Sequence, residues 1–263
     1  MIANSQVAYK KFLKTFEALS YKHSYSDTFS NFLDFALYML TPVKTKDDHE
    51  VMQRLENTYT ETKEAHQMAE LFLCFQDASD NDGQGFHDVL GDLFMELVSH
   101  GRNGQFFTPQ PVCDMMSNML YGDDLQEGKE VCDLACGSGR MLLAMAKMQR
   151  NLKFYGADND ATCCKMAVLN MVINTMPGEI AWMNSLSLEH YRSWHIKRVL
   201  MGTHYVPILF STGKNETNFF RHGLDLSKEE KTQPTPNGKP VNGHDVQTDK
   251  PIIIGQGRQM SFF

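Results

Sequence analysis

The stretch VCDLACGSGRMLLAMAK, residues 131–147, decides the fold. It begins as an apolar run typical of a strand, passes through a glycine-rich turn, and continues with apolar residues at helical spacing. A strand, a glycine turn and a helix in direct succession are typical of a cofactor-binding α/β unit, because the turn lets a ligand approach the backbone at the start of the helix. The surrounding residues decide which cofactor the turn suits.

The glycine pattern favours S-adenosyl-L-methionine over a dinucleotide. The turn contains only Gly137-x-Gly139, whereas a dinucleotide site carries GxGxxG, and no Walker-type lysine follows. A second strand ends in Asp158, about 20 residues downstream, where a carboxylate can accept hydrogen bonds from both ribose hydroxyls. Asp133, directly before the turn, can orient an ammonium group or order the loop. A glycine turn that merely packs a helix on a strand is the alternative.

The composition is that of a globular protein, with 263 residues of which 42% are hydrophobic and 22% charged. No apolar run approaches the roughly 18 residues that span a bilayer, and no signal-peptide pattern begins the chain, so we expect a cytoplasmic protein without membrane contact. The six cysteines form no CxxC pair or zinc-type spacing with histidine, which predicts buried reduced thiols and no metal site. The net charge of −7 argues against coating of nucleic acid by bulk electrostatics but allows a local basic face.

Four parts follow one another along the chain. Residues 1–103 are predicted to form a helical domain, and residues 104–210 alternate strands with helices, which indicates a parallel α/β sheet. Residues 211–250 are polar and rich in Gly, Pro and Asn, as in a flexible linker, before residues 251–263 regain hydrophobicity. The expected elements are one long helix over about 47–78, strands at 130–134, 153–157 and near 180–183, and helices at 139–150 and 160–175.

Three motifs in this order and spacing resemble one known family. They are GQFFTPQPVCDMM (104–116), DLACGSGRML (133–142) and FYGADNDATCCKMAVLNMVIN (154–174). Together they resemble the modification subunits of type I restriction-modification systems, which are adenine-specific N6 DNA methyltransferases. The resemblance covers about residues 86–186. It implies an N-terminal helical bundle followed by a Rossmann-like S-adenosylmethionine-dependent methyltransferase domain, which is truncated here.

The resemblance also implies roles for matched residues. The FFTP segment would line one side of the cofactor pocket, with Thr108 near the methionine carboxylate, and Asp158 would bind the ribose. The residues that the resemblance assigns to the cofactor are Phe106, Phe107, Thr108, Pro109, Asp133, Ala135, Gly137, Gly139, Asp158 and Asn184.

Two of the matched positions depart from the family pattern. Asn184, in MNSL, stands where the family has an acid that accepts a hydrogen bond from the adenine amino group, and an Asn carbonyl can still accept one. Arg140 stands where the family often has a small residue. It either pairs with the cofactor carboxylate or points to solvent.

The segment that would use the methyl group is not found. The family presents the flipped adenine to an N/D-P-P-Y/F segment after its fourth strand, and these 263 residues contain no Pro-Pro pair. Only a degenerate HYVP, with Tyr205 and Pro207, follows the third strand. We therefore expect a cofactor-binding, non-catalytic or partner-dependent subunit of DNA modification. The alternative is an active DNA adenine-N6 methyltransferase with an unrecognised or trans-supplied catalytic segment.

Two further features point to partners. The final residues QMSFF resemble the pentapeptide that binds the bacterial sliding clamp, with Gln259, Met260, Phe262 and Phe263 as the contacting residues, and a plain hydrophobic terminus is the alternative. The basic residues around Trp194 fit either a DNA-phosphate contact or a solvated face with Trp194 in the core; they are Arg192, His195, Lys197 and Arg198. DNA and a partner methyltransferase or specificity subunit complete the expected partners.

Overall fold

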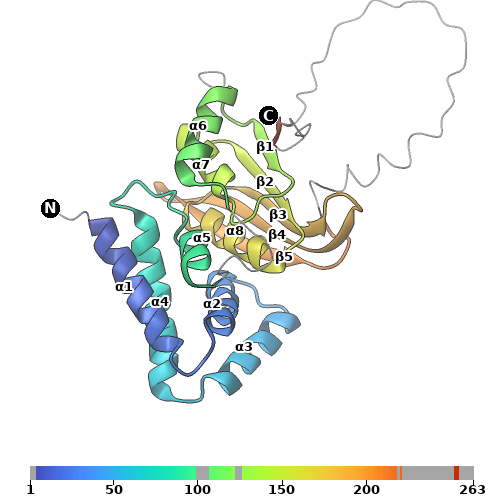
Figure 1. Ribbon diagram of the computed structural model, residues 1–263. Coiled ribbons are helices and arrows are strands. Elements are labelled where there is room, and N and C mark those ends of the chain that lie inside the picture. The colour runs from blue at the N-terminus through green and yellow to red at the C-terminus, as the bar shows by residue number, and fades with distance from the viewer. Residues whose placement is uncertain (1–3, 99–106, 122–125, 218–219, 221–251, 255–263) are drawn as a thin grey trace, which may run out of the picture.

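The computed structural model describes residues 4–98, 107–121, 126–217, 220 and 252–254. The helices of residues 4–98 come first along the chain and lie together beside a twisted sheet, with which the later helices are interleaved, as Figure 1 shows. No helix of the described residues is long and apolar enough to cross a membrane.

The N-terminal part is helical, as predicted. Its elements are α1 (Asn4–Leu19), α2 (Tyr25–Leu40), α3 (Lys46–Thr58), α4 (Thr62–Asp80), α5 (Val89–Leu93) and the π-helical turn η1 (Phe94–Val98). Ser24 caps α2, and Thr45 with Asp48 forms a capping box at the start of α3, so local sequence sets both helix starts. Phe12, Phe16 and other phenylalanines of α1, α2 and α4 are fully buried and form the core of this part.

The single helix predicted over 47–78 is wrong, because α3 and α4 are separate helices. The chain leaves the helical conformation at Tyr59 and is extended at Glu61. This break turns Tyr59 into the core, where its hydroxyl accepts a hydrogen bond from the Asn31 side chain. Burial of that ring favours the turn over a continuous helix.

The second part is a six-stranded mixed sheet with the order β5-β4-β3-β2-β1-β6. Parallel strands are β1 (Glu130–Asp133), β2 (Lys153–Asp158), β3 (Gly178–Asn184) and β6 (Ile252–Ile254). Antiparallel strands are β4 (Glu189–Met201) and β5 (His204–Thr212). The helices are α6 (Gln110–Tyr121), α7 (Arg140–Met148) and α8 (Ala161–Ile173), and α8 contacts both α2 and the sheet.

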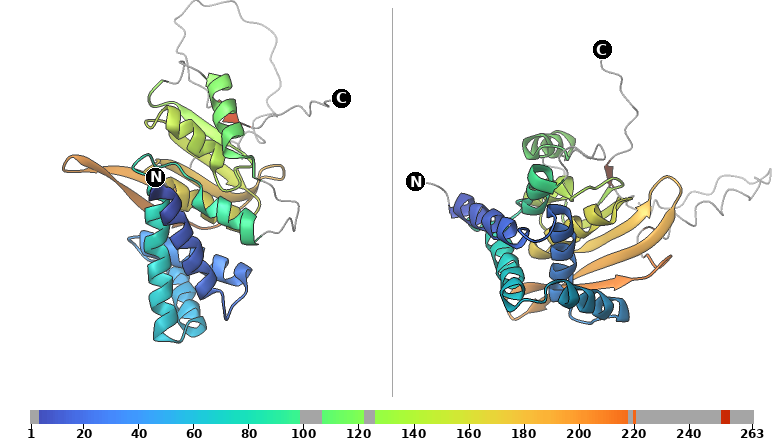
Figure 2. Two further views of the ribbon diagram at one scale, coloured as in Figure 1. Left: turned by 60° about the vertical axis from the view of Figure 1, so that its left-hand side comes forward. Right: turned by 60° about the horizontal axis from the view of Figure 1, so that its bottom comes forward.

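The predicted α/β class is therefore correct, but the expected all-parallel sheet that ends near residue 183 is not. After β3 the chain turns back as a long hairpin, in which β4 pairs with β3 as far as Ile196 and then continues past it together with β5 (Figure 2). The predicted linker starts too early, since β5 continues to Thr212. The sequence places Ile252–Ile254 in the C-terminal peptide, but these residues pair with β1 as strand β6. Residues 221–251, which precede β6, lie outside the described part.

The parallel strands place three polar residues at one edge of the sheet. Asp133, Asp158 and Asn184 end β1, β2 and β3, and parallel strands bring their carboxyl ends together. One hydrophobic core cluster runs from Phe12 in α1 through Met166 in α8 to Ile180 in β3, so the helices and the sheet pack as one unit. This common core holds the carboxyl edge against the helical part.

Candidate functional site

The glycine turn between β1 and α7 needs both of its glycines. Gly137 and Gly139 have positive φ angles of 53° and 83°, which side chains disfavour. A Cβ on Gly137 would lie 3.1 Å from the ring of Phe107, and one on Gly139 would lie 3.2 Å from the Cβ of Ala167. The turn is therefore pressed between the FFTP segment and α8.

Asp158 fixes this turn to the neighbouring strand. Its Oδ2 accepts a hydrogen bond from the Gly137 N–H at 2.9 Å, and its Oδ1 accepts one from the Asp160 N–H at 2.9 Å. The Asn159 N–H also bonds to this carboxylate, and because a carboxylate has about four lone-pair sites, three backbone donors still leave acceptor capacity for a hydroxyl. Burial raises the pKa of Asp158, against the lowering effect of these backbone donors.

Asp133 is the second acid of the turn. Its Oδ1 accepts a hydrogen bond from the Ala135 N–H at 3.1 Å. Burial raises the pKa of Asp133 to about 6, and the charge of Asp158 adds to the rise. Two partly buried carboxylates that disfavour each other's charge would be stabilised by a cation, and the sulfonium and ammonium groups of S-adenosylmethionine are cations. The residues present fit that cofactor.

Asn184 closes the same edge from β3. Its Oδ1 accepts from the backbone N–H groups of Leu186 and Ser187 at 2.9 and 3.1 Å. Because both partners are donors, the oxygen assignment is unambiguous, and the amide NH₂ is the group left to meet a ligand. The neighbouring Ser185 donates from Oγ to the Leu134 carbonyl at 2.7 Å, which ties the end of β3 to the glycine turn.

A buried carboxylate from α5 supports the turn from behind. Asp88 is 1% exposed and caps α5 through the Gly91 N–H. Its Oδ1 also accepts from Asn170 of α8 at 2.7 Å, while its Oδ2 accepts from Ser138 Oγ at 2.5 Å and from Arg140 Nε at 2.9 Å. This one side chain therefore joins α5, α8 and the glycine turn.

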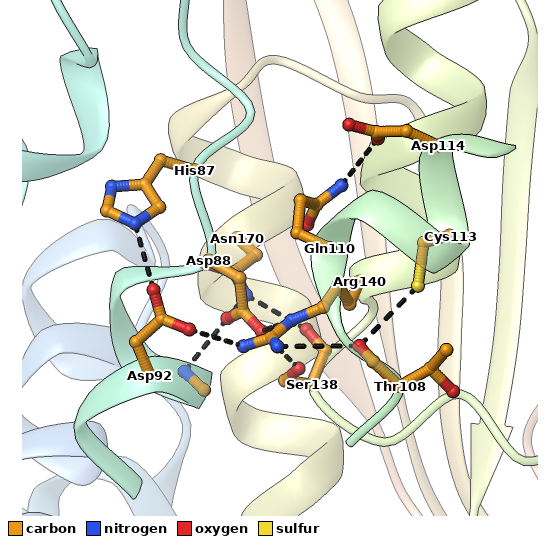
Figure 3. Close-up of polar contacts among 11 residues, drawn as sticks. His87, Asp88, Asp92, Thr108, Gln110, Cys113, Asp114, Ser138, Arg140 and Asn170 are labelled. Atoms are coloured by element: carbon orange, nitrogen blue, oxygen red, sulfur yellow. Dashed lines mark hydrogen bonds and ion pairs between the residues drawn. The ribbon is translucent and has the colours of Figure 1, made fainter. Parts of the chain in front are cut away.

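Arg140 is the counter-charge, and both alternatives expected for it are wrong. Figure 3 shows its guanidinium between Asp88 and Asp92, with Asp92 at 2.7 Å, and the residue is only 8% exposed. Its Nη1 donates to the Thr108 carbonyl at 3.4 Å. It therefore binds neither solvent nor a cofactor carboxylate. Asp88 and Asp92 lie four residues apart in FHDVLGD, and this spacing places them on one helix face. That pair of acids was the signal in the sequence for a basic partner such as Arg140.

The other predicted cofactor residues lie around this network. Phe107 stacks on Phe94 of η1 with 5.6 Å between ring centroids, and Pro109 precedes α6. Ala135 is exposed at the turn. Phe106 and the peptide residues Gln259, Met260, Phe262 and Phe263 lie outside the described residues.

The cysteines are buried free thiols, as predicted. Burial raises the pKa of Cys132 to about 12 and also raises that of Cys136 in the turn itself, so both stay protonated and unreactive at neutral pH. Within the described ranges no cluster of His, Cys, Asp and Glu is arranged to hold a metal ion.

The sheet and its glycine turn define a Rossmann-like, cofactor-binding α/β protein. A family model of N-6 DNA methylases matches residues 86–233, more than half of the chain. The chain therefore belongs to the N-6 DNA methylase family. This membership confirms the predicted family, and with it S-adenosyl-L-methionine as the family's cofactor.

Curated relatives match over a short region. The chain is 29% identical over 100 residues to the methylase subunit of the type I restriction enzyme MpnII of Mycoplasma pneumoniae, covering 34% of this chain and 18% of that subunit. It is 26% identical over 103 residues to the corresponding MjaVII subunit of Methanocaldococcus jannaschii, covering 35% and 17%. The match thus spans less than a fifth of the length of either relative.

Two solved structures are similar in part. One is a type I restriction-modification methyltransferase subunit from Streptococcus thermophilus, with a TM-score of 0.37 and 16% identity over 66% of this chain and 57% of that one. The other is described as a class I S-adenosylmethionine-dependent methyltransferase from Listeria monocytogenes, with a TM-score of 0.45 and 13% identity over 67% and 52%.

The ion pair behind the turn is expected to be strongly coupled. Asp88→Asn leaves the buried guanidinium with Asp92 as its remaining carboxylate partner and turns an amide toward the donors of Asp88, and Arg140→Met leaves a buried carboxylate, so each change should lower the free energy of unfolding by about 3 kcal/mol. The double variant should lose clearly less than the sum of the two, by about 1.5 kcal/mol or more. Urea unfolding of the four proteins measures this coupling, and additive losses would contradict the network.

Proposed function

We propose that this chain binds S-adenosyl-L-methionine at the carboxyl edge of β1, β2 and β3 and serves DNA modification as a non-catalytic or partner-dependent subunit. The observation that carries the proposal is the pair of partly buried carboxylates, Asp133 and Asp158, on either side of a tightly packed turn with two positive-φ glycines. A turn that merely packed a helix on a strand would not need two acids with raised pKa values.

The roles of the residues follow from their free hydrogen-bonding groups. Asp158 accepts a hydrogen bond from the ribose on its remaining acceptor site, and Asp133 holds the ammonium group. Asn184 contributes a donor, which suits a ring nitrogen of adenine better than its amino group. When bound, the cofactor supplies an electrophilic methyl group. Phe107 and the Thr108 carbonyl, which Arg140 holds, form the opposite wall.

The fold supports a missing or external acceptor segment. β1 leads through α7 to β2 on one side, while β6 lies on its other side, so the topological switch point lies at the ends of β1 and β6. Ile254, the last residue of β6, pairs with Asp133, and the chain continues as GQGRQMSFF rather than with an N/D-P-P-Y/F segment. Tyr205 of the degenerate HYVP pairs with Leu200 near the tip of the β4–β5 hairpin. This tip lies beyond the amino ends of the parallel strands, whereas the switch point lies at their carboxyl ends.

The partner proposals have different support. DNA and a specificity or second methyltransferase subunit follow from the similarity to type I methylase subunits, which the chain matches over a short region. The sliding-clamp peptide at Gln259–Phe263 remains a proposal from sequence. β6 leaves only residues 255–258 between the sheet and the peptide, a reach of about 14 Å. Binding of a 251–263 peptide to a bacterial clamp tests it, and a peptide with Gln259→Ala and Phe263→Ala should not bind.

Cofactor binding should follow the charge of the two acids. Titration calorimetry with S-adenosylmethionine should show binding at pH 7, and the affinity should be about tenfold lower at pH 5. The reason is that Asp133, with a pKa of about 6, becomes protonated and loses its negative charge as the pH falls from 7 to 5. Asp158→Ala should abolish binding. Asp133→Asn should bind weakly and with a much flatter pH profile. If the wild-type protein fails to bind the cofactor at pH 7, the proposal is wrong.

Methyl transfer separates the two functional alternatives. The isolated chain should transfer no labelled methyl group from S-adenosylmethionine to DNA, because no described residue presents an amide–proline acceptor at the switch point. Transfer that appears only after a partner subunit is added would establish the partner-dependent form. Transfer by the chain alone, lost in Asp158→Ala, would instead show an active methyltransferase with an unrecognised catalytic segment.

A further inference from the structure

The β4–β5 hairpin continues beyond the rest of the sheet. Pairing between β3 and β4 ends at Gly178 and Ile196, whereas β4 and β5 pair with each other as far as Met201 and His204. Five residues of β4 therefore extend past β3, about 17 Å at the rise of a strand. The left view of Figure 2 shows this two-stranded ribbon projecting from the molecule. It projects at the edge opposite the glycine turn, because β4 runs antiparallel to β3.

The charge of the ribbon differs from that of the chain. Residues 190–214 contain four Lys and Arg residues and no Asp or Glu, although the whole chain has a net charge of −7. The remaining residues thus carry −11, which is −7 less +4. Arg192 and Lys214 pair with Asp48 and Glu189 at 3.6 and 3.9 Å. In the described part of the chain, Lys197 and Arg198 have no carboxylate partner.

Aromatic rings hold the unpaired cations at the base of the ribbon. Lys197 lies 5.1 Å from the centroid of the Phe210 ring, and Arg198 lies 5.1 Å from that of Tyr205. Arg198 also donates to Asn151, and next to it Arg150 lies 4.5 Å from the centroid of the Phe86 ring. Arg150 likewise has no carboxylate partner among the described residues. Three cations are thus positioned by rings and amides rather than neutralised.

Two cavities are lined in part by the residues of this cationic base. One, of about 670 Å³, is lined by Lys153, Lys197, Arg198 and Phe210 among others, and a second, of about 290 Å³, by Arg150, Arg198 and His204. Two acids, Glu127 and Glu179, line the larger cavity, and Glu179 is occupied by the hydroxyls of Ser193 and Thr217. The residues that line each cavity therefore carry a net positive charge.

The tip of the ribbon is apolar and exposed. Leu200 and Met201 are 59% and 62% exposed, and Tyr205 is 57% exposed. An apolar tip alone would fit a protein partner, but such a partner would not require unpaired cations at the base. Cations that contact phosphates, below apolar side chains that contact bases, are the combination by which β-ribbons bind DNA grooves.

We propose that the β4–β5 ribbon binds duplex DNA, with Arg150, Lys197 and Arg198 on the phosphates and the Leu200–Met201 tip in a groove. A two-stranded ribbon fits the major groove, which is about 12 Å wide. Because the ribbon lies at the edge opposite the cofactor turn, it binds a DNA segment other than the one presented for modification. The contact needs no bound cofactor, so its failure and that of the proposed cofactor site are separate outcomes.

Fluorescence anisotropy with a labelled 30-base-pair duplex tests the contact. The full chain should bind at low salt, and Lys197→Gln with Arg198→Gln should weaken binding at least tenfold. The slope of log K against log salt should fall by about 1.8, since each lost phosphate contact accounts for about 0.9. Leu200→Ser with Met201→Ser should weaken binding without changing the slope. Calorimetry with S-adenosylmethionine should be unchanged in all variants.

Lys14→Gln with Lys63→Gln is the matched control, because it removes the same charge from exposed positions of α1 and α4. The control should bind like the wild-type protein. If loss of Arg198 disturbs folding, as judged by the thermal midpoint, Lys197→Gln alone should lower the slope by about 0.9. Equal weakening in the control, an unchanged slope in the ribbon variants, or no duplex binding by the full chain would overturn the proposal.

Discussion

The rest of the structure depends on one buried carboxylate. Asp88 cannot be charged at 1% exposure without donors, and its donors come from α5, α8 and the glycine turn. Separating α5 from the glycine turn would break the buried ion pair between Asp88 and Arg140, which costs several kcal/mol, and separating α8 would remove the hydrogen bond from Asn170. The helical part and the sheet are therefore one structural unit although their sequences show different periodicities, and the common hydrophobic core agrees with this.

The same network explains why an arginine is tolerated in the turn. Arg140 stands at a position where its side chain would meet solvent or ligand if α5 were absent. With Asp88 and Asp92 on α5, the guanidinium instead neutralises two acids and supports the Thr108 carbonyl. The cofactor edge is left with Asp133 and Asp158 and no nearby cation from the turn. A positively charged ligand is favoured there for that reason.

Local patterns predicted the parts of the fold that short segments determine. The strand–turn–helix at 131–147, the acid at the end of β2 and the helical N-terminal part all follow from periodicity and turn chemistry. Contacts between distant segments were missed: Arg140 is 52 residues from Asp88, and β6 pairs with a strand more than 100 residues earlier. The hairpin does not follow from the local pattern, because Lys197 and Arg198 are adjacent and Val199, Leu200 and Met201 follow in a run, so no regular alternation marks a strand there.

The two edges of the sheet have opposite charge, and this separation follows from strand direction. Parallel strands collect Asp133 and Asp158 at their carboxyl ends, while an antiparallel return carries Lys197 and Arg198 to the amino ends. A net charge of −7 averages over these regions and hides both of them. Because screening limits each field to about 10 Å, a cationic cofactor at one edge and an anionic polymer at the other do not compete. Strand direction thus lets an acidic chain offer a site to each.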